Sequence, residues 1–319
     1  MCDTKNHAIR EINLGKREVL TVIGTGEKGN DKEGNKKPED QKLSSPWDIV
    51  AINRDTLIFA MAGTHQIWAL NLKTNRGFKF SGTGKEGNFN NKHDLKSCEW
   101  AQPSGLSLGI ISNSKIELYV ADSESSAIRS INMKTLVASR CLVGGDVNPK
   151  NLHAYGDLDG TNECAKLQHP LGVAFIPEKN VIAVTDTYNH KIKVIDPFNN
   201  EIFSWLGNGH ATLLDQQTFD ASLNEPSGIC SIYDPKEKDI KVFIADCNNH
   251  CIRFVHYDTG FLTTPKIHGI PKMFESYSEE INDDYQEDEK LLLKKSANEN
   301  RGSGNTTMQS KKTNDTTFD

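Results

Sequence analysis

The chain has 319 residues, with 37 Lys and Arg against 43 Asp and Glu, a net charge of −6 and 36% hydrophobic residues. Contacts from Lys and Arg to phosphates supply most of the affinity of nucleic-acid-binding proteins, so this mildly acidic composition argues against a nucleic-acid partner. No apolar run approaches the ~20 residues that span a bilayer, and the polar N-terminus lacks the apolar region of a signal peptide, so we expect neither membrane attachment nor secretion.

Five similar segments recur along the chain, starting at its first residue. Each usually holds an Asp, three mostly polar residues and a His, followed by a short apolar strand that opens with Ile. The Asp column consists of Asp3, Met61, Asp122, Asp186 and Asp246, the His column of His7, His65, Ser126, His190 and His250, and the Ile column of Ile9, Ile67, Ile128, Ile192 and Ile252. Successive members of the Asp column are 58, 61, 64 and 60 residues apart. Such regular spacing indicates a repeat architecture.

Two further columns keep the same spacing. A proline-led stretch precedes each of the last four segments, at Pro46-Trp47-Asp48, Pro103-Ser104-Gly105, Pro170-Leu171-Gly172 and Pro226-Ser227-Gly228. A glycine-rich turn follows each of the first four, at Gly24-Thr25-Gly26, Gly82-Thr83-Gly84, Gly144-Gly145 and Gly207-Asn208-Gly209. Because Pro and Gly interrupt regular structure, these columns mark where the strands of each repeat begin and end.

One repeat illustrates the elements that we predict. Strands are expected at 172–176 and 181–185, a tight turn at 186–190, and two more strands at 191–195 and 201–206. The strands are short, rich in Val, Ile and Phe, and bounded by Gly, Pro, Asn and Asp, and no helical period competes with them. Four short strands in each of several radial repeats are typical of β-propeller blades.

We therefore predict an all-β fold, with a propeller over residues 1–270. A partial blade that begins inside its second strand is expected at about 1–26, and complete four-stranded blades at 44–84, 101–145, 168–209 and 224–270. Residues 276–319 are polar, with ten acidic and six basic side chains. We expect this tail to be disordered, because it can bury too little apolar surface to offset its ordering entropy.

The columns resemble the NHL repeat, whose signature is P-x-G followed by V-A-D-x-x-N-H-R-I. Segments 186–192 and 246–252 are close matches, whereas Met61 and Ser126 depart from the signature. The resemblance implies a six-bladed ring in the intact parent, of which this chain would be a fragment. The stretch 156–170 narrows the resemblance to relatives that also carry a thioredoxin-like domain before the propeller and a β-rich domain after it.

The repeated polar residues have structural explanations that we prefer to chemical ones. Zinc ligands lie within ~2.3 Å of one ion, whereas one His per blade is spread around a ring. We expect the His column to pack the turns and the Asp column to cap its own turn backbone. The glycine turns lack the helix that follows a phosphate loop, and residues 157–163 lack the full calcium-loop pattern. We predict no catalytic residue, no metal and no cofactor.

The cysteines also favour an intracellular setting. The seven are odd in number and contain no C-x-x-C pair. Small secreted disulfide scaffolds use denser, even sets, so reduced thiols in the cytosol are the simpler interpretation. Cys247 and Cys251 are a close pair in the sequence, but they flank a predicted turn, and we assign them neither a disulfide nor a metal.

Four functions stay open, and we rank them. First is a non-enzymatic scaffold for unknown protein partners, with Thr64, Glu124, Tyr188 and Asn248 outermost on the face that the predicted turns form. Second is redox activity, which the resemblance implies for the thioredoxin-like domain of the intact parent. Third is metal-dependent catalysis of the kind that some related propellers perform. RNA binding, known for other NHL propellers, comes last because these blades lack a basic face.

Overall fold

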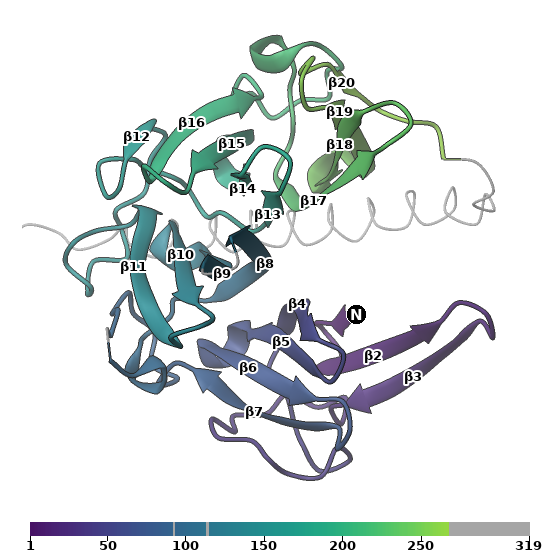
Figure 1. Ribbon diagram of the computed structural model, residues 1–319, viewed down its shortest axis with the longest axis vertical. Coiled ribbons are helices and arrows are strands. Elements are labelled where there is room, and N and C mark those ends of the chain that lie inside the picture. The colour runs from purple at the N-terminus through teal and green to yellow at the C-terminus, as the bar shows by residue number, and fades with distance from the viewer. Residues whose placement is uncertain (92, 113–114, 268–319) are drawn as a thin grey trace, which may run out of the picture. The chain divides into compact units, whose positions relative to one another are not determined.

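Most of the regular structure consists of short antiparallel strands (Figure 1). The computed structural model describes residues 1–267, except residues 92 and 113–114 and the side chains of 137–140. The predicted tail, 276–319, and the last residues of the predicted propeller, 268–270, lie outside this range. Residues Met1–Pro265 form one compact unit.

The strands form five sheets, which we number as blades 1 to 5. Blade 1 consists of β1 (Cys2–Asp3), β2 (Ala8–Asn13) and β3 (Glu18–Ile23). Blade 2 consists of β4 (Pro46–Asn53), β5 (Thr56–Met61), β6 (Gln66–Asn71) and β7 (Arg76–Ser81). Blade 3 consists of β8 (Pro103–Ser112), β9 (Lys115–Asp122), β10 (Ala127–Asn132) and β11 (Val137–Gly144). Blade 4 consists of β13 (Val173–Ile176), β14 (Val181–Asp186), β15 (Lys191–Asp196) and β16 (Glu201–Leu206), with β12 (Gly160–Thr161) added outside β16. Blade 5 consists of β17 (Pro226–Asp234), β18 (Asp239–Asp246), β19 (Cys251–His256) and β20 (Leu262–Thr263).

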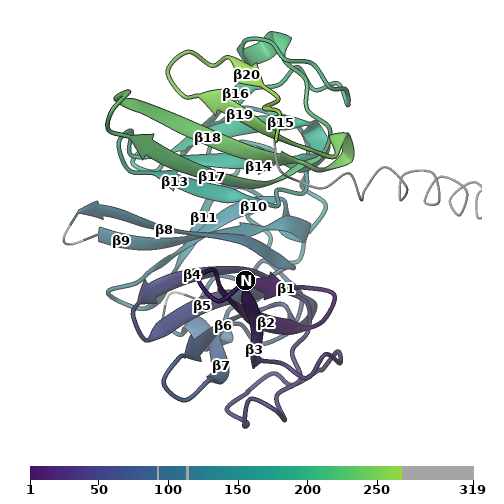
Figure 2. The same cartoon turned by 90° about the vertical axis from the view of Figure 1, so that its right-hand side faces the viewer.

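The predicted count of one partial and four complete blades is confirmed. Consecutive strands pair side by side within each blade, as where Ile182 lies opposite Ile195 and Asp186 opposite Lys191. The blades follow one another in chain order along an arc, with blades 1 and 5 at its two ends (Figure 1), and their sheets lie face to face (Figure 2). The extra strand β12 was not predicted, and it comes from the insertion between blades 3 and 4.

The hydrophobic core lies between the blades. Ile9 and Ile23 of blade 1 pack against Phe59 and Trp68 of blade 2, and similar clusters fill the junctions of blades 2 and 3, 3 and 4, and 4 and 5. The Ile column supplies one residue to each junction, and its first four members are at most 1% exposed. Full burial of such a side chain contributes about 1.5–3 kcal/mol to folding.

In blades 2 to 5, the turns between the second and third strands are single 3₁₀ turns. They are η1 (Ala62–Thr64), η3 (Ser123–Ser125), η4 (Thr187–Asn189) and η6 (Cys247–Asn249). Each is followed by a residue of the His column with a positive φ, at His65, Ser126, His190 and His250. The left-handed conformation is uncommon outside glycine but is enriched for His, which helps explain the column. Two further 3₁₀ turns, η2 (Leu95–Ser97) and η5 (Thr218–Asp220), lie in the insertions between blades.

Candidate functional site

In blades 3 to 5, each Asp of the column connects the turn that follows it to the loop before the first strand of the same blade. Asp122, Asp186 and Asp246 are fully buried. Their Oδ1 atoms accept hydrogen bonds from the backbone N–H groups of Ala101, Gln168 and Asn224, at 2.8, 2.7 and 2.7 Å. None of these three side chains caps the 3₁₀ turn that follows it. The expected cap of the turn's own backbone is therefore wrong, because the carboxylate faces the loop before the inner strand.

Each Asp of the column forms an ion pair with an Arg or Lys seven residues later in the chain. This cation was not predicted from the sequence. Oδ2 of the carboxylate lies 3.1 Å from Arg10 Nε in blade 1, 2.7 Å from Arg129 Nη1 in blade 3, 3.5 Å from Lys193 Nζ in blade 4 and 2.6 Å from Arg253 Nη1 in blade 5. Blade 2 has Met61 and Trp68 at these two positions, both buried. The signal was present in the sequence, since a cation follows every Asp of the column and is missing only where Asp itself is missing.

Burial governs the ionisation of these pairs. It raises the pKa of Asp122, against the opposing charge of Arg129. It also raises the pKa of Asp186, to about 6, although Lys193 opposes the change. Burial by itself would lower the pKa of Lys193, but the charges of Asp186, Asp157 and Asp159 more than offset it and hold that pKa above its usual value.

The His column joins each blade to the next one. Nδ1 of His7, His65 and His190 accepts a hydrogen bond from the backbone N–H of Ser45, Gln102 and Glu225, at 3.0, 3.2 and 3.1 Å. Each of those donors precedes the proline of the following blade and has a positive φ. In blade 3 the Ser126 hydroxyl takes the place of the imidazole and accepts from the His169 N–H at 3.3 Å. The column is thus a set of links between blades.

The first glycine of each glycine-rich turn lies close to the backbone of the preceding His-column residue. Gly24, Gly82, Gly144 and Gly207 have positive φ values. A Cβ atom at these positions would lie between 2.4 and 3.0 Å from the carbonyl oxygen of the preceding His-column residue. Only glycine satisfies both the backbone conformation and this close approach.

The predicted contact face needs one correction. Glu124, Tyr188 and Asn248 are the exposed middle residues of their 3₁₀ turns. Thr64 is only 4% exposed, because it is the third residue of η1, and the exposed middle residue of that turn is Gly63. Met61 and His65 align this repeat with the others, but the prediction took the residue three positions after the Asp column, whereas the middle of each turn lies two positions after it.

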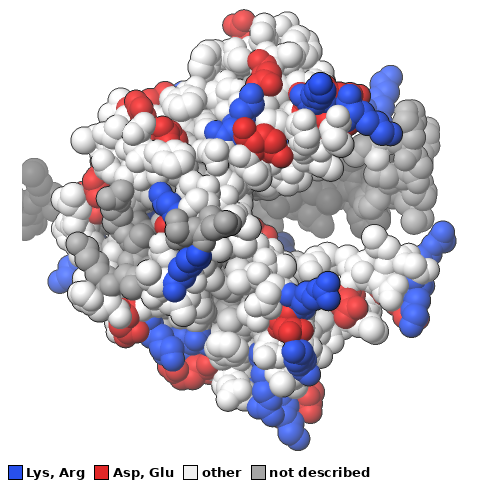
Figure 3. Space-filling model, viewed as in Figure 1, with Lys and Arg blue, Asp and Glu red and all other residues white. Residues whose placement is uncertain are grey.

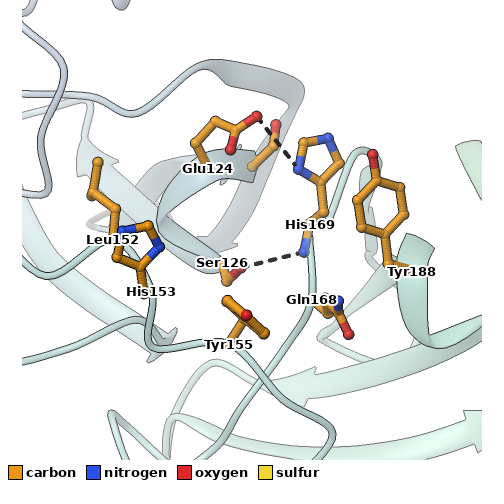
Figure 4. A pocket seen from close by; sticks show the side chains of 9 residues that line it. Glu124, Ser126, Leu152, His153, Tyr155, Gln168, His169 and Tyr188 are labelled. Atoms are coloured by element: carbon orange, nitrogen blue, oxygen red, sulfur yellow. Dashed lines mark hydrogen bonds and ion pairs between the residues drawn. The ribbon is translucent and has the colours of Figure 1, made fainter. Parts of the chain in front are cut away.

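Glu124 and Tyr188 meet at the junction of blades 3 and 4, where they line a pocket of about 170 Å³ (Figure 4). Between them lies His169, whose ring stacks on Tyr188 with centroids 4.5 Å apart and planes 9° apart. His169 Nδ1 is 3.7 Å from Glu124 Oε1. Ser126 lies below, and Leu152, His153 and Tyr155 complete the wall. We call this hollow the junction pocket.

The junction pocket lies where the repeat departs from its signature. Ser126 is smaller than the imidazole at the corresponding position of the other described blades, so space remains beside it. The insertion that carries Leu152, His153 and Tyr155 is fastened nearby, because Asn189 Nδ2 donates to Gly156 O at 2.7 Å. Ser126 stood out in the sequence as a departure from the repeat, but the roles of His169, His153 and Tyr155 were not predicted, since His153 and Tyr155 lie in an insertion whose sequence does not repeat.

The electrostatics of the junction pocket combine one carboxylate with aromatic rings. Burial lowers the pKa of His169, against the opposing charges of Glu124 and Glu225, so this imidazole is neutral at neutral pH. The Glu124 side chain is 45% exposed and can pair with an incoming group. A volume of about 170 Å³ is below the ~300–1,000 Å³ of most small-molecule sites and suits a single side chain.

Three further structural findings concern metal ligands, cysteines and membrane-spanning helices. Among the described residues, no three or more His, Cys, Asp or Glu side chains gather as metal ligands would. All seven cysteines are free thiols. No helix in the described part of the chain is long and apolar enough to cross a membrane.

The four-stranded sheets, their repeated turns and the P-x-G columns define an NHL-repeat β-propeller. A family model described as the NHL repeat matches residues 167–195, which contain β13, β14 and all but the last residue of β15.

Among individual proteins, the chain is similar to NHL repeat-containing protein 2. It is 42% identical to that of Bos taurus over 278 residues, which are 81% of this chain and 37% of that protein. It is also 40% identical over 263 residues to Protein SUPPRESSOR OF QUENCHING 1, chloroplastic, of Arabidopsis thaliana, covering 82% of this chain and 24% of that protein. The chain thus spans well under half the length of these relatives.

A solved structure supports the fold alone. The nidogen/laminin complex aligns with a TM-score of 0.51 and 12% sequence identity, covering 84% of this chain and 78% of that chain.

Proposed function

We propose that this propeller is a non-enzymatic scaffold that binds a protein partner, and that the junction pocket is a principal contact. The observation that supports this most is the convergence of Glu124, His169 and Tyr188 on one exposed hollow. Tyr188 is 47% exposed although its ring is held by stacking on His169. A rigid aromatic ring beside a charged group is typical of residues that dominate protein–protein binding.

The charge distribution favours a protein over a nucleic acid. Lys and Arg are interspersed with Asp and Glu over the face in Figure 3, so no continuous basic surface is available there for phosphates. The redox alternative concerns a thioredoxin-like domain of the intact parent and stays a prediction. The metal-dependent alternative would need a ligand set that has not been identified among the described residues.

Quantitative affinity purification from cells tests the proposal. Tyr188→Ala and Glu124→Gln alter the junction pocket, and we expect both to lose the same specific proteins that the unchanged chain retains. Phe198→Ala is the matched control, because Phe198 is another exposed aromatic residue and lies in the turn between β15 and β16, at the opposite end of blade 4. Identical sets of proteins for all variants would contradict the proposal.

A further inference from the structure

A second hollow lies where the inner strands of the blades meet. It has a volume of about 220 Å³ and is lined by the proline-led stretches of blades 2 to 5. Its lining residues are Trp47, Asp48, Gly105, Leu171, Gly172, Val173, Ser227, Gly228 and Ile229. We call it the central channel.

Asp48 breaks the P-x-G column. The corresponding residues of the other blades are Gly105, Gly172 and Gly228. At Gly105 and Gly172 a Cβ atom would lie only 2.6 and 2.1 Å from a carbonyl oxygen of the next blade, so no side chain fits there. Blade 2 is thus the blade that presents a carboxylate to the central channel.

The carboxylate of Asp48 is held in place but has no counter-ion among the residues that the structure describes. Its Oδ2 accepts from the Leu106 N–H of blade 3 at 2.8 Å, and its Oδ1 from the Ile49 N–H at 2.8 Å. An ionised carboxylate has about four acceptor positions, so two stay available. Burial raises the pKa of Asp48, and no Lys or Arg among the described residues pairs with it.

Trp47 supplies an aromatic wall beside this charge. Its side chain is 42% exposed. Besides the central channel, it lines a hollow of about 670 Å³ together with Gly63 of η1 and His7. Trp47 therefore lies where the central channel meets the face that bears the 3₁₀ turns. The exposed Lys5 and Lys28 line this hollow of about 670 Å³ and are not among the residues that line the central channel.

We propose that the central channel binds an alkylammonium group, such as the side chain of a partner's lysine, with Asp48 as counter-ion and Trp47 as cation–π partner. Charge-assisted hydrogen bonds are about twice as strong as neutral ones. An ammonium over an indole adds further attraction, which grows when water is excluded. Pairing also relieves the unfavourable burial of the Asp48 charge. The site is distinct from the junction pocket.

Fluorine NMR of the 319-residue chain labelled with 5-fluorotryptophan tests the site. The chain has four tryptophans, and the loss of one resonance in Trp47→Leu assigns the signal of Trp47. We expect n-butylammonium to shift that signal saturably, and n-butanol, which lacks the charge, to have little effect. Equal shifts from both compounds, or a response to calcium chloride in place of n-butylammonium, would overturn the proposal. This comparison needs no variant at Asp48.

Variants then identify the counter-ion. Asp48→Asn should weaken n-butylammonium binding by about tenfold, the loss of one charge-assisted contact, while Glu124→Gln should leave it unchanged. Unaltered binding by Asp48→Asn would contradict the assignment. A tripeptide with a central lysine tests whether the natural ligand is a protein. We expect the tripeptide to bind more tightly than n-butylammonium, whereas equal or weaker binding would indicate a free amine. Because Glu124→Gln affects the junction pocket alone, failure here is separable from failure of the partner-binding proposal.

Discussion

Asp122 and Asp186 occupy the same position in successive blades but differ in the groups around their cations. Arg129 has Asp122 as its one carboxylate partner among the described residues and otherwise donates to neutral oxygen atoms, such as the Glu99 carbonyl. Lys193 has Asp157 and Asp159, at 2.8 and 3.2 Å, in addition to Asp186. The same substitution should therefore have different consequences in the two blades.

We predict that Asp122→Asn lowers the free energy of unfolding by about 3–5 kcal/mol, because Arg129 would be left buried without a counter-ion. At pH 7, Asp186→Asn should cost only about 1 kcal/mol, since Lys193 keeps two carboxylates and the asparagine oxygen can still accept from the Gln168 N–H. Urea denaturation of the two variants measures this difference. Equal losses would show that the additional carboxylates do not matter.

The pKa of Asp186 predicts how this variant depends on pH. Because burial raises that pKa to about 6, the folded state favours the protonated carboxyl. The resulting stabilisation is present below the pKa of the unfolded chain, near 3.9, and is lost as the pH rises through about 6. Asp186→Asn cannot titrate, so wild type should lose up to about 3 kcal/mol relative to it between pH 4 and 7. Urea denaturation across that range measures the change, and a wild-type advantage that grows with pH would contradict the assignment.

At the scale of elements, each link that the His column makes between blades is a single hydrogen bond. We predict that His65→Ala and His190→Ala each lower the free energy of unfolding by about 1–2 kcal/mol, because a backbone N–H at a blade junction loses its acceptor. His250→Ala is the matched control, since it has the same positive φ, and no such link from His250 to a following blade appears in residues 1–267. Amide exchange adds a local readout, in which Glu225 should lose protection in His190→Ala alone. Equal effects at all three histidines would refute the linking role.

The elements themselves were predictable from the sequence, and the side-chain contacts only in part. Strand positions followed from the Pro, Gly, Asp and Ile columns, because each column marks a place where backbone geometry or burial is demanding. The cation that pairs with each Asp follows it at a constant spacing of seven residues, but it was missed because only the pairing of the two strands shows that the side chains meet. The junction pocket was missed because His153 and Tyr155 come from an insertion without a repeat, so no column drew attention to them.

At the scale of the whole molecule, each junction between two described blades buries its residue of the Ile column, whereas that of blade 5, Ile252, stays partly exposed. Ile252 is 38% exposed, whereas Ile192 is fully buried. Ile232, on the same face of blade 5, is 58% exposed. Repeat proteins gain their stability from such neighbour contacts, so an uncovered blade face favours association.

We predict that the 319-residue chain self-associates in solution and that Ile252→Lys reduces this association without unfolding the protein. Ile192→Lys, at the equivalent position of blade 4, should instead prevent folding, because the ammonium would be buried without a partner. Sedimentation velocity and circular dichroism distinguish these outcomes. A wild-type chain that sediments as a monomer would disprove the prediction.

Site-specific photo-crosslinking in cells tests the central claim, that the junction pocket binds a protein partner, most directly. A photoreactive phenylalanine analogue is placed at Tyr188 or, as the control, at Phe198, and the crosslinked products are identified by mass spectrometry. Our account predicts a discrete crosslinked partner from position 188 that is absent from position 198 and is diminished by Glu124→Gln. No product at position 188, or the same products from both positions, would contradict it.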